Sequence, residues 1–136
     1  MKIRSASHTD ESAIASLWQT CSLVVSYNDP VFDFRFALGK SGSDILVAED
    51  NDIIGSVMVG HDGHRGWLYY VAVAPSHRKK GVGRALVKAA EEWLTMRGVP
   101  KAHLMLREHN WDAAAFYARL GYEPMPRINM QKWLKP

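Results

Sequence analysis

The chain has 136 residues, of which 47% are hydrophobic and 23% are charged, as in a single soluble globular domain. Its net charge of +3 is weaker than that of most dedicated nucleic-acid binders, which argues against that class. The single cysteine, Cys21, excludes an internal disulfide, and the longest apolar run (67–74) is too short to span a bilayer. The N-terminal segment 1–12 lacks the apolar core of a signal peptide, so we predict one domain over residues 1–136 in the cytoplasm.

The first half of the chain predicts a strand, two helices and a β-hairpin. A strand at 2–6 precedes a helix that opens near Ser7 or Thr9. A second short helix follows Pro30 and ends near Gly39. The segments 45–49 and 53–60, joined by a short polar turn, read as a β-hairpin. The apolar positions of the first helix recur at helical spacing: Ile14, Leu17, Trp18, Cys21 and Val25.

The second half adds strands and two more helices. Segment 67–74 is apolar on both faces, which predicts a central, fully covered strand. A helix follows it and ends at Gly98, and segment 102–107 reads as another strand. A helix over 111–120 closes at Gly121, and segment 122–134 predicts one or two last strands, held to a sheet edge by Pro124 and Pro126. The order predicts a layered α/β (α+β) fold with a mixed central sheet of six or seven strands and about four helices.

The stretch SHRKKGVGRAL at 76–86 carries the clearest functional signal. Glycine residues at 81 and 83 can adopt positive φ and let a ligand approach the backbone. The free amides and the dipole of the following helix favour an anion. The side chains of Arg78, Lys79, Lys80 and Arg84 add positive charge. We therefore predict a pyrophosphate site here, although a solvated basic loop stays open as an alternative.

Two motifs narrow the ligand. The Walker pattern is absent, and the dinucleotide pattern G-x-G-x-x-G fails where Leu86 stands. RKKGVG at 78–83, in contrast, resembles the R-x-x-G-x-G/A signature of the GNAT superfamily of N-acetyltransferases. NWDAAAFYARLGY at 110–122 resembles the second motif of that superfamily. The element order also matches, so the resemblance covers nearly the whole chain, and it points to a small bacterial single-domain branch.

The resemblance implies direct transfer of an acetyl group from acetyl-CoA to a primary amine of a small molecule or a protein N-terminus. Tyr117 stands at the position of the general acid, and Asn110 would touch the pantetheine or hold a loop near it. The Val71 amide would stabilise the oxyanion. The pantetheine would pair with Val71, Ala72 and Val73, and the pyrophosphate would lie on Arg78, Lys79, Lys80, Gly81, Val82, Gly83 and Arg84.

A tyrosine suits the role of acid, because its ordinary pKa of about 10 keeps it protonated at neutral pH, whereas the departing thiolate has a pKa near ~8.5. The alternative is that Tyr117 is only a packed aromatic beside Phe116. The base is less clear. Many superfamily members carry a glutamate on this strand, at approximately the positions of Trp67 and Tyr69. Neither tryptophan nor tyrosine is a strong base.

The missing carboxylate favours an acceptor of low pKa or a water chain that ends at Glu108, Asp62 or His64. It also keeps open a second function, a CoA-binding GNAT-fold module with little or no activity. The loop His61–Gly66 contains only two histidines and one aspartate as possible metal ligands, and no cysteine, so we predict no metal. Asp29 and Asp33 could attract a cationic amine, but local turn and helix-start roles are simpler.

As partners we predict acetyl-CoA and an amine acceptor, and neither nucleic acid nor membrane. A basic loop could bind nucleic acid, but no aromatic platform lies beside it in the sequence. The oligomeric state is not encoded in any pattern that we can read, and a homodimer is left open.

Overall fold

The computed structural model describes residues 1–135, which fall into two compact units. The second unit begins at Leu106 and contains α4 (Trp111–Arg119). The first unit, Met1–Met105, contains the other elements of the described chain. These are β1 (Lys2–Ser5), the 3-10 helix η1 (His8–Asp10), α1 (Glu11–Thr20), α2 (Pro30–Ala37), β2 (Ser43–Asp50), β3 (Asp52–His61), β4 (Gly66–Val73), the 3-10 helix η2 (Pro75–His77), α3 (Val82–Met96) and β5 (Ala102–Leu104).

The strands form one five-stranded sheet in the order β1-β2-β3-β4-β5. Neighbouring strands run antiparallel except β4 and β5, which are parallel. The parallel pair is short, because it joins only residues 66–68 of β4 to residues 102–104 of β5. Within the first unit as described, residues 69–73 of β4 therefore have no strand partner on the β5 side.

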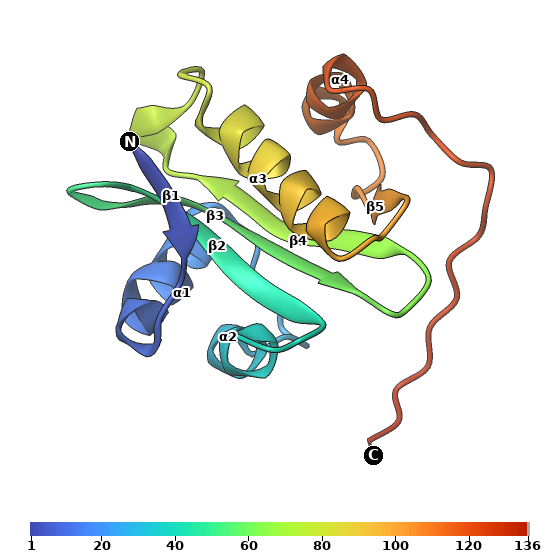
Figure 1. The fold of residues 1–136 in the computed structure, drawn as a ribbon, viewed down its shortest axis with the longest axis horizontal. Helices are drawn as coiled ribbons and strands as arrows, with labels where there is room; N and C mark the ends of the chain where they lie inside the picture. Colours follow the sequence, from blue (N-terminus) through green and yellow to red (C-terminus); the bar gives the residue numbers. More distant parts are fainter. Residues whose placement is uncertain (136) are drawn as a thin grey trace. The chain divides into compact units, whose positions relative to one another are not determined.

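Helices cover both faces of this sheet, as Figure 1 shows for α1 and α2 on one side and α3 on the other. The strands alternate their side chains between the two faces, so each face supplies part of a core. On the first face α1, α2 and the sheet share one buried cluster: Ile14, Leu17, Trp18, Phe34, Ala37, Ile45, Val47 and Ala72. On the second face α3 buries Val82, Leu86, Val87, Ala90, Trp93 and Leu94.

Short polar contacts fix where the first helices begin. The Asp10 carboxylate accepts the backbone N–H of Ser7 at 2.8 Å and the guanidinium of Arg4 at 2.8 Å, which orients the entry to α1. Asp29 caps α2, because its Oδ1 accepts the N–H groups of Val31 and Phe32. Asp29 therefore has the local structural role that the sequence favoured.

Two glycines let α3 lie close to the sheet. A Cβ atom added at Gly55 of β3 would lie 2.8 Å from Leu86 Cδ1 and 3.0 Å from the Ala72 carbonyl oxygen. A Cβ atom added at Gly66 of β4 would lie 2.6 Å from Leu94 Cδ1. The distances to the two leucines are below 3.0 Å, so a larger residue at either position would displace the leucine side chains of α3 or α3 itself. The close approach sets the height of α3, and of the loop before it, over β3 and β4.

The prediction of six or seven strands was wrong. The sheet has five strands, and residues 122–135 contain no strand. Pro124 and Pro126 lack the N–H that a ladder requires, so strand pairing cannot continue through them. The apolar side chains further along, Ile128 and Met130, are 90% and 89% exposed.

Two boundaries and the exposure of one strand also differ from the sequence prediction. α1 ends at Thr20, so Cys21 and Val25 follow it rather than extend its apolar face. β5 stops at Leu104 instead of reaching residue 107. β4 is not fully covered, because Tyr69 is 41% exposed. Hydrophobicity alone misled here, since an aromatic side chain can line an open face as well as a core.

Candidate functional site

The loop between β4 and α3 presents the first amides of α3 to its surroundings. Gly81 is the N-cap of α3 and has φ +83, where an added Cβ would meet no atom within 4 Å. No side chain of the described chain caps α3. The N–H of Ala85 donates to the Gly81 carbonyl at 3.1 Å, so the amides of residues 82–84 have no acceptor within the helix. These amides form a ready anion site.

The loop itself departs from the sequence expectation in one respect. Gly83 lies inside α3 and is not among the residues with positive φ. The second left-handed residue is Lys79, with φ +63. A non-glycine residue in this conformation is strained, and such strain gathers where a structure holds the backbone for a purpose. The side chains of Arg78, Lys79, Lys80 and Arg84 are all exposed.

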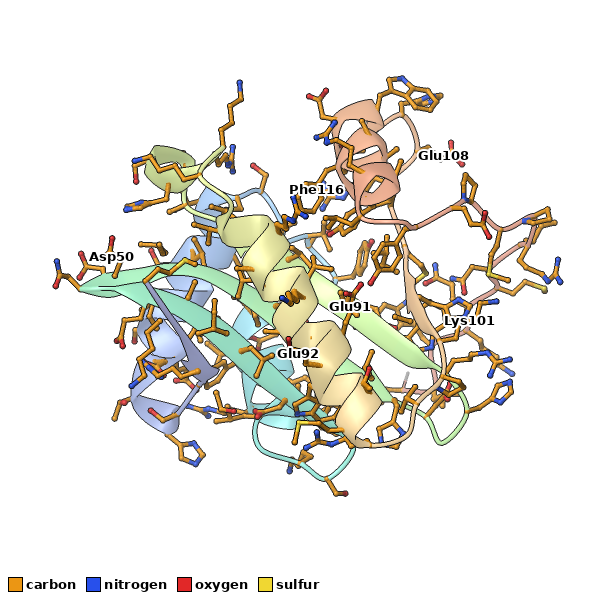
Figure 2. All side chains as sticks on the ribbon, turned by 45° about the horizontal axis from the view of Figure 1, so that its top comes forward. Asp50, Glu91, Glu92, Lys101, Glu108 and Phe116 are labelled. Carbon is orange, nitrogen blue, oxygen red and sulfur yellow. The ribbon has the colours of Figure 1, made fainter. Side chains whose placement is uncertain are left out.

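The N-terminal end of α3 has no acidic side chain of its own helix. The first turn of α3 contains no acidic residue, although the helix dipole would favour one there. The acidic pair Glu91 and Glu92 lies on the body of the helix, further along its axis (Figure 2). The N-terminal end of α3 therefore combines free amides with positive charge and has no nearby carboxylate of its own helix to compete with an anion.

The open edge of β4 ends directly before this loop. The N–H of Ala74 donates to the Ile54 carbonyl of β3 at 2.8 Å, so the alternation of an antiparallel pair turns the backbone groups of Val73 away from β3. The Val73 carbonyl accepts Arg78 Nε at 3.1 Å and Cys21 Sγ at 3.4 Å. Ala72 pairs with Ser56, is 3% exposed and turns its backbone groups toward β3.

The second unit holds the two residues of the second motif. Asn110 is the N-cap of α4, where its Oδ1 accepts the N–H of Ala113 at 3.2 Å. Tyr117 lies on α4 and is 9% exposed, with the rings of Phe116 and Tyr122 edge-on to it at 4.9 and 5.8 Å. Burial raises the pKa of Tyr117 to about 12, so its hydroxyl keeps its proton at neutral pH.

The three candidate ends of a water chain differ in how they are engaged. Asp62 holds the turn between β3 and β4, because its Oδ1 accepts the N–H groups of His64 and Arg65 at 2.9 and 2.8 Å. These bonds lower the pKa of Asp62 and make it a weaker base. His64 lies in the same turn, and Glu108 belongs to the second unit (Figure 2).

His103 of β5 is a further candidate base that the sequence analysis missed. Its ring packs on Trp67 of β4 with centroids 4.9 Å apart. Its Nε2 atom is buried and has no hydrogen-bond partner among the described residues. Burial, followed by the charges of Lys101 and Arg65, holds the pKa of His103 below the ordinary histidine value, so the imidazole is neutral at pH 7. Only strand pairing brings it beside Trp67, so no local pattern could have found it.

Asp33 also has a contact that the sequence did not show. Its Oδ2 accepts the hydroxyl of Tyr70 at 2.7 Å, which joins α2 to β4. A surface pocket of about 390 Å³ opens over β3 and β4. Met58, Trp67 and Tyr69 line it, and Asp62 and His61 lie at the turn. The pocket combines apolar and aromatic walls with a carboxylate.

The comparison with protein families is decisive. Residues 11–122 match the model of the acetyltransferase (GNAT) family, which spans both motifs. The chain belongs to the GNAT acetyltransferase family. An acetyltransferase of Pectobacterium atrosepticum is 42% identical over 135 residues, which cover 98% of this chain and 96% of that protein. The resemblance seen in the sequence is thus confirmed.

Solved structures show the same GNAT fold. AAC(6')-Iy in complex with the bisubstrate analogue CoA-S-monomethyl-acetylneamine superposes with a TM-score of 0.83 at 19% identity and covers 97% of each chain. Glucosamine-6-phosphate N-acetyltransferase from Arabidopsis thaliana has a TM-score of 0.77 at 22% identity and covers 98% of each chain. At these identities the likeness concerns the fold alone.

Within residues 1–135, no group of three histidine, cysteine or acidic side chains is arranged to hold a metal ion. None of the helices described is both long enough and apolar enough to cross a membrane.

Proposed function

We propose that this protein is an acetyl-CoA-dependent N-acetyltransferase that transfers the acetyl group directly to a primary amine. The observation that carries the proposal is the cluster of uncapped amides at residues 82–84, set in an exposed basic loop at the end of an open strand edge. A diphosphate would satisfy the amides and the charges, and a pantetheine arm could pair with the backbone of β4. Membership of the GNAT family supports the same assignment.

The proposed chemistry gives each group one task. The amine nitrogen attacks the thioester carbonyl carbon, a C–N bond forms and the C–S bond breaks. The Val71 N–H stabilises the oxyanion that develops. Tyr117 donates its proton to the departing thiolate, and a base removes the proton that the amine loses. The Nδ2 group of Asn110 is not used in the cap and could contact the pantetheine.

The proposed acceptor is a small-molecule amine or a protein N-terminus. The aromatic walls at Trp67 and Tyr69 suit a cationic or apolar group beside the reacting amine. We keep residues 1–136 as one functional domain, because the family match runs through both compact units. Two further predictions from the sequence stay as they were: a cytoplasmic location and no metal requirement. A homodimer stays an open alternative.

An acetylation screen tests the function. The protein should release CoA from acetyl-CoA when supplied with small amines, polyamines or peptides with free N-termini, measured at pH 7 and pH 9. Acetyl-CoA alone should raise the melting temperature, because a ligand that binds only the folded state stabilises it. A clear thermal shift without turnover of any amine would favour the CoA-binding module instead. If acetyl-CoA gives no thermal shift and no amine is turned over, both proposed functions are overturned.

We further propose that His103 is the base, directly or through one water. Changing His103→Gln should lower kcat at saturating amine by roughly 100-fold at pH 7.5, in the range of general-base contributions. The wild-type kcat should fall with decreasing pH below the ordinary histidine value of 6.5, since the pKa of His103 is lowered, and this acid limb should vanish in the variant. His8→Gln changes an exposed histidine of η1, far in the sequence from the proposed site, and is the matched control that should leave the profile unchanged. An unaltered kcat and acid limb in His103→Gln would exclude this role.

A further inference from the structure

A bulge in β4 lies where the strand passes from its paired to its open half. The register with β3 joins Met58 to Tyr69 and Ser56 to Ala72, so two residues of β4 oppose one residue of β3. Tyr70, the first of the two, has φ +50, a conformation that costs energy for a residue with a bulky side chain. Something outside the local sequence must therefore hold the backbone at this point.

Two buried side chains hold it. Ser56 of β3 donates its Oγ hydrogen to the Tyr70 carbonyl at 3.0 Å. The indole Nε1 of Trp18, on α1, donates to Ser56 Oγ at 2.9 Å. Both Trp18 and Ser56 are 0% exposed, so water cannot replace either bond. The indole also stacks on the Tyr70 ring, with centroids 3.9 Å apart and planes 12° apart.

The hydrogen bonds from Trp18 to Ser56 and from Ser56 to Tyr70, together called the relay, determine where the Val71 amide points. The chain has no cis peptide bond, so the Tyr70 carbonyl and the Val71 N–H, which share one planar unit, point in opposite directions. Because Ser56 fixes the carbonyl on the β3 side, the Val71 N–H faces away from β3. That is the side on which β4 has no strand partner beyond residue 68.

We propose that Ser56 and Trp18 are positioning residues for acetyl transfer: they lock the 70–71 peptide so that the Val71 N–H stays aimed at the open edge of β4. The inference rests on the proposed function, in which this amide meets the oxyanion. A donor must already be oriented before the charge develops, because reorientation during the reaction would consume the stabilisation it gives. Without Ser56 the Tyr70 carbonyl loses its partner, and the strained peptide is free to rotate.

Kinetics of three variants test this relay. Ser56→Ala should lower kcat roughly 10- to 100-fold, while KM for acetyl-CoA changes much less, because the diphosphate is held elsewhere. Trp18→Phe keeps an aromatic ring but removes the N–H, and should have a smaller effect of the same kind. In the double variant the two losses should not add, as expected for residues that act as one unit. Val87→Ala, another change of a fully buried side chain but on α3 and outside the acceptor pocket, should lower the melting temperature without lowering kcat.

A second measurement is independent of turnover. The NMR relaxation-dispersion profile of the Val71 amide should be flat in the wild type. In Ser56→Ala the profile should show exchange, because the 70–71 peptide begins to move between orientations. If the Val71 amide behaves identically in both proteins, the relay is refuted, whatever the enzyme does. If wild-type turnover is robust and Ser56→Ala retains full kcat, the relay has no catalytic purpose. If the wild type shows no turnover while the Val71 amide responds, the proposed function fails and the positioning stands.

Discussion

The Gly83→Asp variant should bind acetyl-CoA roughly 100-fold more weakly than the wild type, or worse, and should melt at the same temperature or higher. A carboxylate about 4–6 Å from a phosphate costs roughly 3–4 kcal/mol at an effective dielectric constant of 20. The same carboxylate in the first turn of α3 is favourable for the helix, because it complements the dipole. Residue 83 is the second residue of α3, so the substitution separates ligand binding from folding.

Calorimetric titration with acetyl-CoA and the thermal shift measure this effect together. Gly83→Asn is the matched control, because asparagine has nearly the size of aspartate and no charge. If charge repulsion is the cause, Gly83→Asn should keep most of the affinity that Gly83→Asp loses. Equal loss in both variants would indicate steric exclusion at residue 83. An undiminished thermal shift in Gly83→Asp would place the diphosphate away from this loop.

Removal of one oxygen atom in Tyr117→Phe should lower kcat by about 10²- to 10⁴-fold, the range typical of a lost general acid. The phenylalanine ring keeps the edge-on contacts with Phe116 and Tyr122, so the fold should be retained. Because burial raises the pKa of Tyr117 to about 12, the hydroxyl stays protonated through the whole working range. We therefore expect no alkaline fall in kcat from this group below about pH 11.

Steady-state kinetics at saturating acetyl-CoA and amine, from pH 6 to pH 10, test this role. Tyr122→Phe removes the hydroxyl of the neighbouring ring and should keep the wild-type kcat. A thiolate of pKa near ~8.5 is a fair leaving group, so an unassisted departure is the competing mechanism. If Tyr117→Phe loses only a small factor in kcat, the thiolate leaves without a proton, and Tyr117 is a packed aromatic of α4.

The local parts of the structure followed from local parts of the sequence. The hairpin of β2 and β3, the helix after the glycine loop and the positive φ of Gly81 depend on residues that are neighbours in the chain. The proposed anion site is of the same kind, because it would consist of consecutive backbone amides and basic side chains. Asn110 and Tyr117 were predicted as site residues because a motif of thirteen residues, 110–122, carries them together, and their roles stay a proposal.

The sequence prediction failed where the outcome depended on distant partners. The tail 122–134 has strand-like composition, but pairing needs free N–H groups, which Pro124 and Pro126 do not have. β5 was predicted to reach residue 107, but it pairs with β4 only through Leu104, and the extent of a parallel pair depends on the partner strand rather than on local sequence. Tyr69 and Trp67 were read as core, although they line an open pocket.

By itself the sequence determined the order of the elements up to residue 119, the basic loop with its free helix amides and the family, because each of these is encoded within a short run of residues. Only the tertiary structure decided which way the Val71 amide points, which imidazole lies beside Trp67, and which carboxylate meets Tyr70. Each of these depends on residues more than ten positions apart, such as Trp18 and Ser56, and a contact of that kind exists only after the sheet and its helices have packed.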